Sequence, residues 1–294
     1  MSRVEQRSAI TIEPGRASSA RLDRVAPLER SEGSLVVAID AIGTCGTDRE
    51  ILAGKYGAAS PGHKRLTIGH ESLGHVIEAP GDSGFAKGAR VAGIVRRPDP
   101  VPCPHCAIGE WDLCSNGRYT ERGIKQRDGY ATEIVRLEPA FAVRVDAALG
   151  TAGVLTEPAS VVAKAWAEID CFASRSAADV KRSVLVTGAG PMGLLAALMG
   201  VQRQHDVTVY DHAESGPKPD PVRDLGAGYR SPSAHPLRDG DRFDVILDAG
   251  VDALARADRA WLERLISRRV PLDDWPRAFE RQPGDVKAVL DFAG

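Results

Sequence analysis

The sequence has no long apolar run and almost no net charge, and each absence excludes a class of protein. The longest apolar stretch, around 194–201, is far shorter than the ~20 residues of a transmembrane helix. A formal net charge of −2 gives neither a basic field for nucleic acid nor a polybasic membrane anchor. Segment 1–15 has scattered charges and no apolar core of a secretory signal. We therefore expect a cytoplasmic protein without nucleic-acid or membrane partners.

The length of 294 residues favours two domains, each with a sizeable core. Short strand-like segments at 35–42, 74–78, 90–95 and 130–135 are separated by Gly, Pro and Asp. Many short strands without long helices predict a barrel-like β domain up to about residue 155. A helix is predicted at 159–172, where one domain passes to the next.

Cysteine is scarce, and its placement indicates metal ligation. Five cysteines are an odd number, and four of them lie in Gly-, Pro- or His-rich surroundings, which in a reducing compartment favours metal over disulfides. Cys45, His70 and Glu71 offer zinc ligands in glycine-flanked segments that can fold tightly around an ion. His70 and His75 are five residues apart, so they do not fit the i, i+4 helical metalloprotease pattern. Cys171, in the apolar stretch 166–173, is expected to be buried.

A second cluster, at 102–114, contains Cys103, Cys106 and Cys114. A Cys-x-x-Cys followed closely by a third cysteine can hold a closed structural zinc if a fourth ligand exists. Asp112 is our first choice for that ligand and His105 our second. The alternative is three free surface thiols, which is weaker because exposed thiols oxidise without benefit.

A glycine-rich loop follows a strand predicted at 183–187 and precedes an apolar helix at 194–201. Gly188 permits a tight turn, Gly190 lets the backbone approach a pyrophosphate, and Gly193 allows close packing of the helix on the strand. The helix N-terminus would face the phosphates. The loop reads Gly188-Ala189-Gly190-Pro191-Met192-Gly193, and its setting between strand and helix predicts a dinucleotide site.

The next strand, predicted at 207–210, ends in Asp211, at the distance from the loop expected of a ribose-binding carboxylate. Asp211 would accept hydrogen bonds from both ribose hydroxyls and repel a 2′-phosphate, which favours NAD. The preference is mild because His212, Lys218 and Arg223 follow and could bind the phosphate of NADP. A solvated acid at the strand end is the alternative for Asp211.

The nucleotide domain is shorter than a complete one. A third strand is predicted near Tyr229 and a fourth at 243–248, then a helix at 252–268 and a final strand at 286–292. A complete fold of this order uses six strands. We therefore expect a truncated Rossmann-type domain.

These motifs resemble the zinc-dependent medium-chain dehydrogenases, most closely their glucose 1-dehydrogenase branch. The similarity covers most of 35–250 and resumes near Trp261. The resemblance implies an α/β protein with a GroES-like β-barrel catalytic domain (1–158 and 270–294) and a truncated Rossmann domain (159–269). The most specific matching segments are 45–51, 69–71, 95–98, 119–124, 156–158, the glycine loop and 270–275.

The resemblance also implies roles for individual residues. Cys45, His70 and Glu71 would surround the catalytic zinc, with Glu157 as a direct or exchangeable fourth ligand. Thr47 would hydrogen-bond the zinc-bound substrate hydroxyl or pass its proton outward. Glu121 would bind sugar hydroxyls; a solvated charge beside Arg122 is its alternative role. The three cysteines at 103–114 match the structural zinc site of the branch.

The chain departs from the family after Asp248, where two further strand–helix units would line the nicotinamide and form the dimer-pairing strand. We therefore leave open whether the protein forms a homo-oligomer, but we do not expect the usual dimer strand to form the interface. We predict a zinc-dependent oxidoreductase that moves hydride from a sugar or polyol hydroxyl carbon to NAD or NADP. The alternative is a redox-neutral zinc lyase or epimerase, or a cofactor-impaired homologue. A non-enzymatic binding module is the third reading, and the retained Thr47 and zinc ligands argue against it.

Overall fold

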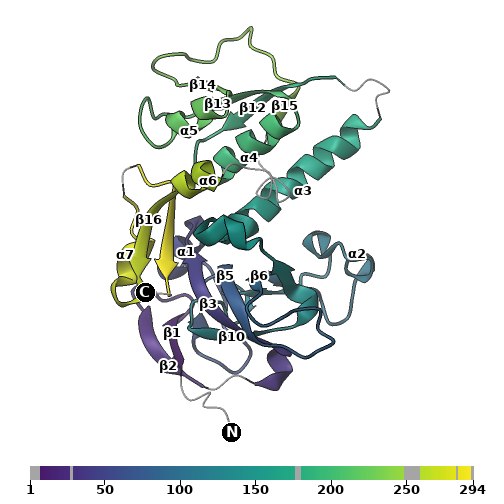
Figure 1. Ribbon diagram of the computed structural model, residues 1–294, viewed down its shortest axis with the longest axis vertical. Coiled ribbons are helices and arrows are strands. Elements are labelled where there is room, and N and C mark those ends of the chain that lie inside the picture. The colour runs from purple at the N-terminus through teal and green to yellow at the C-terminus, as the bar shows by residue number, and fades with distance from the viewer. Residues whose placement is uncertain (1–6, 27–28, 176–179, 248–258, 283, 293–294) are drawn as a thin grey trace. The chain divides into compact units, whose positions relative to one another are not determined.

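The computed structural model describes residues 7–26, 29–175, 180–247, 259–282 and 284–292, which form two compact units (Figure 1). The first unit contains Met1–Ala147, Arg269–Phe279 and Val289–Gly294. The second contains Ala148–Arg268 and Glu280–Ala288. The predicted domain boundary after residue 158 lies within the second unit, because 148–158 already belong to it.

The first unit is built mostly from antiparallel strands, although β8 and β9 pair in parallel. Its largest sheet has seven strands in the order β11-β6-β5-β3-β17-β16, with β10 also paired to β3. A three-stranded sheet has the order β2-β1-β4, and another the order β7-β8-β9. The bounds of the first eleven strands are β1 Arg7–Ile12, β2 Arg21–Val25, β3 Leu35–Gly43, β4 Leu66–Thr67, β5 Glu71–Glu78, β6 Arg90–Gly93, β7 Arg96–Arg97, β8 Thr120–Arg122, β9 Gln126–Arg127, β10 Ile134–Leu137 and β11 Ala142–Arg144.

Strand β3 is the centre of this unit. It is rich in the β-branched and small apolar residues that suit a strand covered on both faces, and most of its side chains are buried. It pairs with β5, β10 and β17, so it brings early, middle and late parts of the chain together. The core around it consists of buried Ile, Val and Leu, with Tyr130 and Phe279 as its aromatic members.

Short helices connect these strands. They are α1 (Gly46–Leu52), α2 (Pro104–Ala107) and α7 (Pro276–Phe279), together with the 3-10 turns η1 (Arg30–Glu32), η2 (Trp111–Leu113), η3 (Pro139–Phe141) and η6 (Leu272–Asp274). The predicted final strand is confirmed as β17 (Lys287–Asp291), which pairs antiparallel with β3. The predicted strand at 130–135 begins later, as β10, because residues 129–132 bond backbone atoms of several separate segments.

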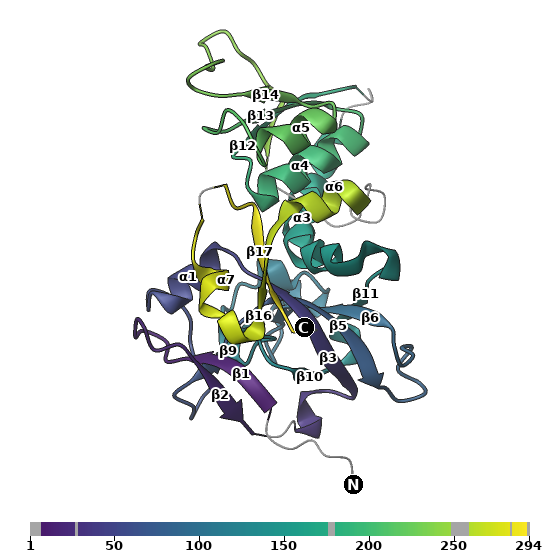
Figure 2. The same ribbon diagram turned by 60° about the vertical axis from the view of Figure 1, so that its left-hand side comes forward.

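The second unit has a four-stranded parallel sheet in the order β14-β13-β12-β15. Helix α4 packs on β12 and β13, and it also contacts α3 and α5. Figure 2 shows these three helices together on one side of the sheet. The bounds of the remaining elements are η4 Ala147–Leu155, α3 Thr156–Ala173, β12 Ser183–Thr187, α4 Pro191–Gln202, β13 Asp206–Tyr210, α5 Pro219–Asp224, β14 Gly228–Arg230, β15 Val245–Leu247, α6 Arg259–Leu265 and β16 Ile266–Pro271, the last of which belongs to the seven-stranded sheet.

Two expectations for this unit are corrected. Cys171 is exposed, not buried, because the buried stripe of α3 runs through Val162 and Trp166 and Cys171 lies off that stripe. The predicted helix at 252–268 ends at Leu265, and the β-branched residues of 266–271 form strand β16. Its first part, 252–258, lies outside the described residues. Among the described residues, no helix combines the length and apolar character needed to cross a bilayer.

Candidate active site and metal centres

The pairing of β3 with β5 brings the predicted zinc ligands together. Gly43, at the end of β3, lies opposite Glu71, at the start of β5. Two residues later Cys45 caps helix α1, and His70 immediately precedes β5. The Cys45 Sγ atom lies 3.2 Å from His70 Nε2. Two residues that are 25 positions apart in sequence thus present their donor atoms to one point.

Asp48 completes this group and was not singled out from the sequence. It is fully buried in the first turn of α1, and its Oδ2 accepts a hydrogen bond from the Cys45 backbone N–H at 2.9 Å. Its Oδ1 lies 3.4 Å from His70 Nδ1, the ring nitrogen opposite the one that faces Cys45. A carboxylate on the distal nitrogen fixes the orientation of a metal-binding histidine. The available signal was an acid three residues after a helix-capping Cys45.

The surroundings of His70 favour a positive charge on its ring. Burial lowers the pKa of His70, but the Asp48 carboxylate and the Cys45 contact outweigh it and raise that pKa well above its usual value. Potential ligand atoms of Cys45, Asp48 and His70 all lie within 4.8 Å of one another. Sulfur and imidazole donors supported by a buried carboxylate suit zinc. The donor set of this chain therefore fits the metal implied by the sequence.

The other predicted residues of this centre have different settings. Glu71 is buried next to His70, at 2% exposure, and Thr47 is half-buried in the first turn of α1. Glu157 lies in the first turn of α3, in the second compact unit, so its role as a ligand stays a prediction. His75 points elsewhere: it lies within strand β5 and pairs with Asp40 at 2.8 Å. His70 and His75 therefore do not form the metal site of a helical metalloprotease.

Glycines fix the backbone around His70. Gly69 has φ +88°, and Gly123 has φ +74°. A Cβ atom on Gly123 would lie 2.4 Å from the Gly69 carbonyl oxygen, and one on Gly129 would lie equally close to it. Only glycine permits three backbone segments to meet at this distance. The contact holds the β8 segment that carries Glu121 against the segment that carries His70.

Glu121 is neither a solvated charge nor a partner of Arg122. Its Oε1 accepts two hydrogen bonds from Arg96, from Nη2 at 2.8 Å and from Nε at 3.1 Å. Successive side chains of a strand point to opposite sides, so Arg122 projects the other way. Burial and the Glu121 carboxylate raise the pKa of Tyr56, which therefore shares the Glu121 surroundings.

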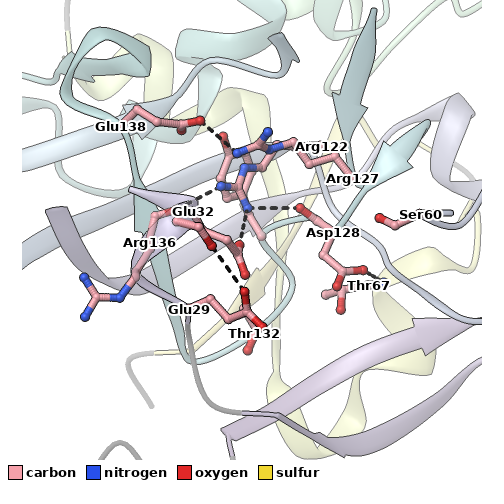
Figure 3. A network of polar contacts seen from close by, with 12 residues as sticks. Glu29, Glu32, Ser60, Thr67, Arg122, Arg127, Asp128, Thr132, Arg136 and Glu138 are labelled. Carbon is pink, nitrogen blue, oxygen red and sulfur yellow. Dashed lines mark hydrogen bonds and ion pairs between the residues drawn. The ribbon is translucent and has the colours of Figure 1, made fainter. Parts of the chain in front are cut away.

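Arg122 lies in a buried polar network behind this site (Figure 3). Its guanidinium donates to the backbone carbonyls of Asp128 and Arg136 at 3.2 and 2.9 Å and lies 3.5 Å from Glu32. Arg127 donates to Glu138 at 2.8 Å in the same network. These bonds connect residues 122–128, the segment that follows Glu121, to residues 136–138.

The three cysteines at 103–114 form a second candidate metal centre. Potential ligand atoms of Cys103, Cys106 and Cys114 lie within 4.8 Å of one another, and Cys103 caps α2. The Cys106 backbone N–H, followed by the hydroxyl and N–H of Ser115, lowers the pKa of Cys103 to about 5. A thiolate next to two further sulfurs fits a soft cation.

The described contacts of both candidates for the fourth ligand are with other groups. His105 Nδ1 instead contacts Glu110 at 3.1 Å. The backbone carbonyl of Asp112 accepts a hydrogen bond from Arg96 at 3.1 Å. The assignment of Asp112 as the fourth ligand stays a prediction.

The glycine loop has the geometry that its residue types predict. Gly188 has φ +87°, Gly190 caps α4, and Pro191 begins it. A Cβ atom on Gly193 would lie 1.9 Å from the Gly188 carbonyl oxygen, so only glycine allows this helix–strand contact. A Cβ atom on Gly190 would meet nothing within 4 Å, which leaves space at the helix N-terminus. Met192 lies in the first turn of α4, between Pro191 and Gly193.

Asp211 is tied to this loop. Its Oδ2 accepts a hydrogen bond from the Ala189 N–H at 2.8 Å, and Lys218 Nζ lies 3.3 Å from both carboxylate oxygens. Burial alone would raise the pKa of Asp211. The N–H donors of Ala189 and Ala213 and the charge of Lys218 outweigh burial, so the pKa lies below its usual value. His212 is exposed beside it. Asp211 thus stabilises the loop itself, a role that the motif alone did not indicate.

A separate cavity of about 670 Å³ in the first unit contains none of the predicted site residues. Acidic and basic side chains both line it, including Glu29, Glu32, Lys64 and Arg127. Part of its wall appears in Figure 3. We place the chemistry at the sulfur, imidazole and carboxylate group and not in this cavity, because its mixed charges converge on no reacting centre.

Comparison with known proteins identifies the family. Residues 31–147 match the alcohol dehydrogenase GroES-like domain, and 150–249 match the glucose dehydrogenase C-terminus. Glucose 1-dehydrogenase 1 of Vulcanisaeta moutnovskia is 34% identical over 293 residues, which cover 86% of this chain and 80% of the relative. Glucose 1-dehydrogenase of Metallosphaera sedula is 35% identical over 335 residues, which cover 90% and 93%.

Glucose dehydrogenase from Haloferax mediterranei, in complex with NADP, Zn and gluconolactone, has the same fold, with a TM-score of 0.80. The match covers 98% of this chain and 99% of that structure at 22% identity, so it establishes the fold alone. This chain belongs to the zinc-dependent medium-chain dehydrogenase family, in its glucose 1-dehydrogenase-like branch. The predicted fold class and family are confirmed.

Proposed function

We propose that this protein is a zinc-dependent oxidoreductase that transfers hydride from the hydroxyl carbon of a sugar or polyol to NAD or NADP. The observation that carries the proposal is the Cys45 Sγ atom 3.2 Å from His70 Nε2, with Asp48 buried behind the histidine. Relatives named glucose 1-dehydrogenases support an aldose as substrate and its lactone as product. The substrate loses a hydride and a proton, and the dinucleotide is reduced.

The catalytic residues have distinct tasks in this proposal. Cys45, His70, Glu71 and Glu157 would hold the zinc, and the contact of Asp48 with His70 Nδ1 would fix the orientation of the ring for it. When bound, zinc polarises the substrate hydroxyl and lowers its pKa. Thr47 would hydrogen-bond the substrate hydroxyl or pass its proton outward. Glu121 accepts hydrogen bonds from the sugar.

The cofactor-binding residues lie in the second unit. Backbone atoms of Gly188, Gly190, Pro191, Met192 and Gly193 would bind the pyrophosphate at the start of α4. Asp211 and His212 would bind the adenosine ribose. The choice between NAD and NADP stays open, because Lys218 already pairs with Asp211.

Other assignments also stay predictions: a zinc-binding domain at 1–158 and 270–294, a nucleotide domain at 159–269, a cytoplasmic location, and a structural zinc at Cys103, Cys106 and Cys114 with Asp112. A homo-oligomer would need an interface other than the usual dimer strand. The 335-residue alignment with the Metallosphaera sedula relative is longer than this 294-residue chain, so that relative has residues without a counterpart here.

The test is turnover by the purified, zinc-loaded chain. We expect aldoses or polyols to generate the absorbance of reduced cofactor with NAD or NADP, and His70→Ala to abolish it. His75→Ala is the matched control, since that histidine pairs with Asp40 and should leave activity unchanged. No signal with either cofactor at full zinc occupancy would overturn the proposal.

The redox-neutral lyase or epimerase was motivated by the shortened nucleotide domain, and the names of the relatives do not favour it. Calorimetric titration with NADH and NADPH separates the two functions. Tight binding of either dinucleotide supports the oxidoreductase, whereas zinc binding without dinucleotide binding would support the redox-neutral alternative.

A further inference from the structure

Arg96 is the only described residue whose side chain bonds the Glu121 carboxylate. The two residues lie directly opposite each other on the antiparallel strands β7 and β8. Both hydrogen bonds go to one oxygen, Oε1, at 2.8 and 3.1 Å. The carboxylate is therefore fixed through one oxygen, while Oε2 can accept a hydrogen bond from another donor.

Arg96 is itself held from several directions. Its Nη1 donates to the backbone carbonyls of Trp111 and Asp112, at 3.3 and 3.1 Å. Its guanidinium carbon lies 4.0 Å from the centre of the Tyr119 ring. The two carbonyls belong to the segment between Cys106 and Cys114, so Arg96 joins the cysteine cluster to Glu121.

We propose that Arg96 is a positioning residue for substrate specificity: it holds Oε1 of Glu121 so that Oε2 faces a hydroxyl of a neutral aldose. This inference rests on the proposed function and deepens it. Arginine suits the task because its planar fork donates in several fixed directions at once, which lysine cannot do. The arginine also neutralises the carboxylate, so the pair favours neutral polyhydroxyl substrates over charged ones.

A merely structural link between the cysteine cluster and the barrel would have different consequences. Loss of such a link would lower stability and kcat without a selective effect on sugar affinity. Loss of a positioning contact would weaken sugar binding, raise KM and leave kcat nearly unchanged. The two roles can therefore be separated by measurement.

Lys125 provides a matched control. Its Nζ lies 3.8 Å from the centre of the same Tyr119 ring and donates to the Gly117 carbonyl at 2.6 Å. It thus contacts the same ring and also bonds the segment after the cysteines, but its side chain makes no bond to Glu121 in the described structure. Lys125→Met removes a comparable cation without disturbing the carboxylate.

The experiment measures binding of D-glucose to the zinc-loaded full chain by saturation-transfer NMR, together with KM and kcat. We expect Arg96→Gln to weaken binding and raise KM about tenfold, the scale of one hydrogen bond to a charged group. Arg96→Lys should lose less, and Lys125→Met should stay within about twofold of wild type. Arg96→Gln added to Glu121→Gln should cause no further loss, because both act through one carboxylate.

Unchanged glucose binding in Arg96→Gln would overturn the proposal. Equal losses in Arg96→Gln and Lys125→Met, or additive losses in the double variant, would also overturn it. Failure of the proposed function would give a different result. If wild type binds D-glucose but reduces neither NAD nor NADP, the positioning role of Arg96 is retained and the oxidoreductase function is refuted. If wild type binds no D-glucose, the positioning role fails.

Discussion

Replacing Gly123 by alanine should disrupt the backbone contact that supports His70. The new Cβ atom would lie 2.4 Å from the Gly69 carbonyl oxygen and 2.7 Å from the Gly69 carbonyl carbon. Both are backbone atoms, so no flexible side chain can move aside. Gly123 also has φ +74°, a conformation that alanine adopts only with strain.

The magnitude follows from two contributions. The left-handed conformation costs a non-glycine residue about 1–2 kcal/mol. Forcing an extra methyl group into a packed site costs typically a further ~1–3 kcal/mol. We therefore expect a loss of about 2–5 kcal/mol in the free energy of unfolding of the first unit, and weaker zinc binding because Gly69 is adjacent to His70.

Urea unfolding and a zinc titration against a chromophoric chelator measure these two effects. Gly62→Ala is the control, because Gly62 has φ +81° and a Cβ atom there would meet nothing within 4 Å. It should show the conformational cost alone, about 1–2 kcal/mol, with unchanged zinc affinity. If Gly123→Ala is no less stable than Gly62→Ala, the close contact between Gly123 and Gly69 does not contribute to the stability of the first unit, and the reasoning is refuted.

Three further predictions concern single side chains. Asp48→Asn should reduce zinc affinity about 10- to 100-fold, the usual effect of losing the carboxylate behind a metal-binding histidine; Asp40→Asn, which breaks the similar Asp40–His75 pair, should not change it. Gly193→Ala should abolish NAD(H) binding in calorimetry, since its Cβ would overlap the Gly188 carbonyl, whereas Gly216→Ala, where a Cβ atom would meet nothing within 4 Å, should retain binding. Asp211 has a lowered pKa when folded, so its stabilising effect is complete above the unfolded value near 3.8 and is lost as pH falls through the folded pKa; Asp211→Asn should remove that part of the acid sensitivity in urea unfolding, and identical pH profiles for variant and wild type would contradict it.

Local patterns in the sequence were sufficient for the first strand of the parallel sheet, the glycine turn and the helix after it. Strand 183–187 was located correctly, as were the glycine turn and the helix that follows it. The reason is that Gly188, Gly190 and Gly193 act through short-range backbone geometry, which is visible in consecutive residues. The candidate zinc ligands Cys45, His70 and Glu71 were recognisable for a similar reason, since each lies in a glycine-flanked segment.

Long-range contacts decided the rest. No sequence pattern showed that the Glu121 carboxylate bonds Arg96, because the two residues meet only through the pairing of β7 with β8. The exposure of Cys171 depended on which face of α3 is buried, and an apolar neighbourhood in sequence does not specify that face. The role of Asp48 likewise became clear only when β3 and β5 brought His70 beside α1. The sequence by itself determined which residue types the site contains, whereas the tertiary structure decided their partners, because hydrogen bonds and ion pairs depend on distances that strand pairing sets.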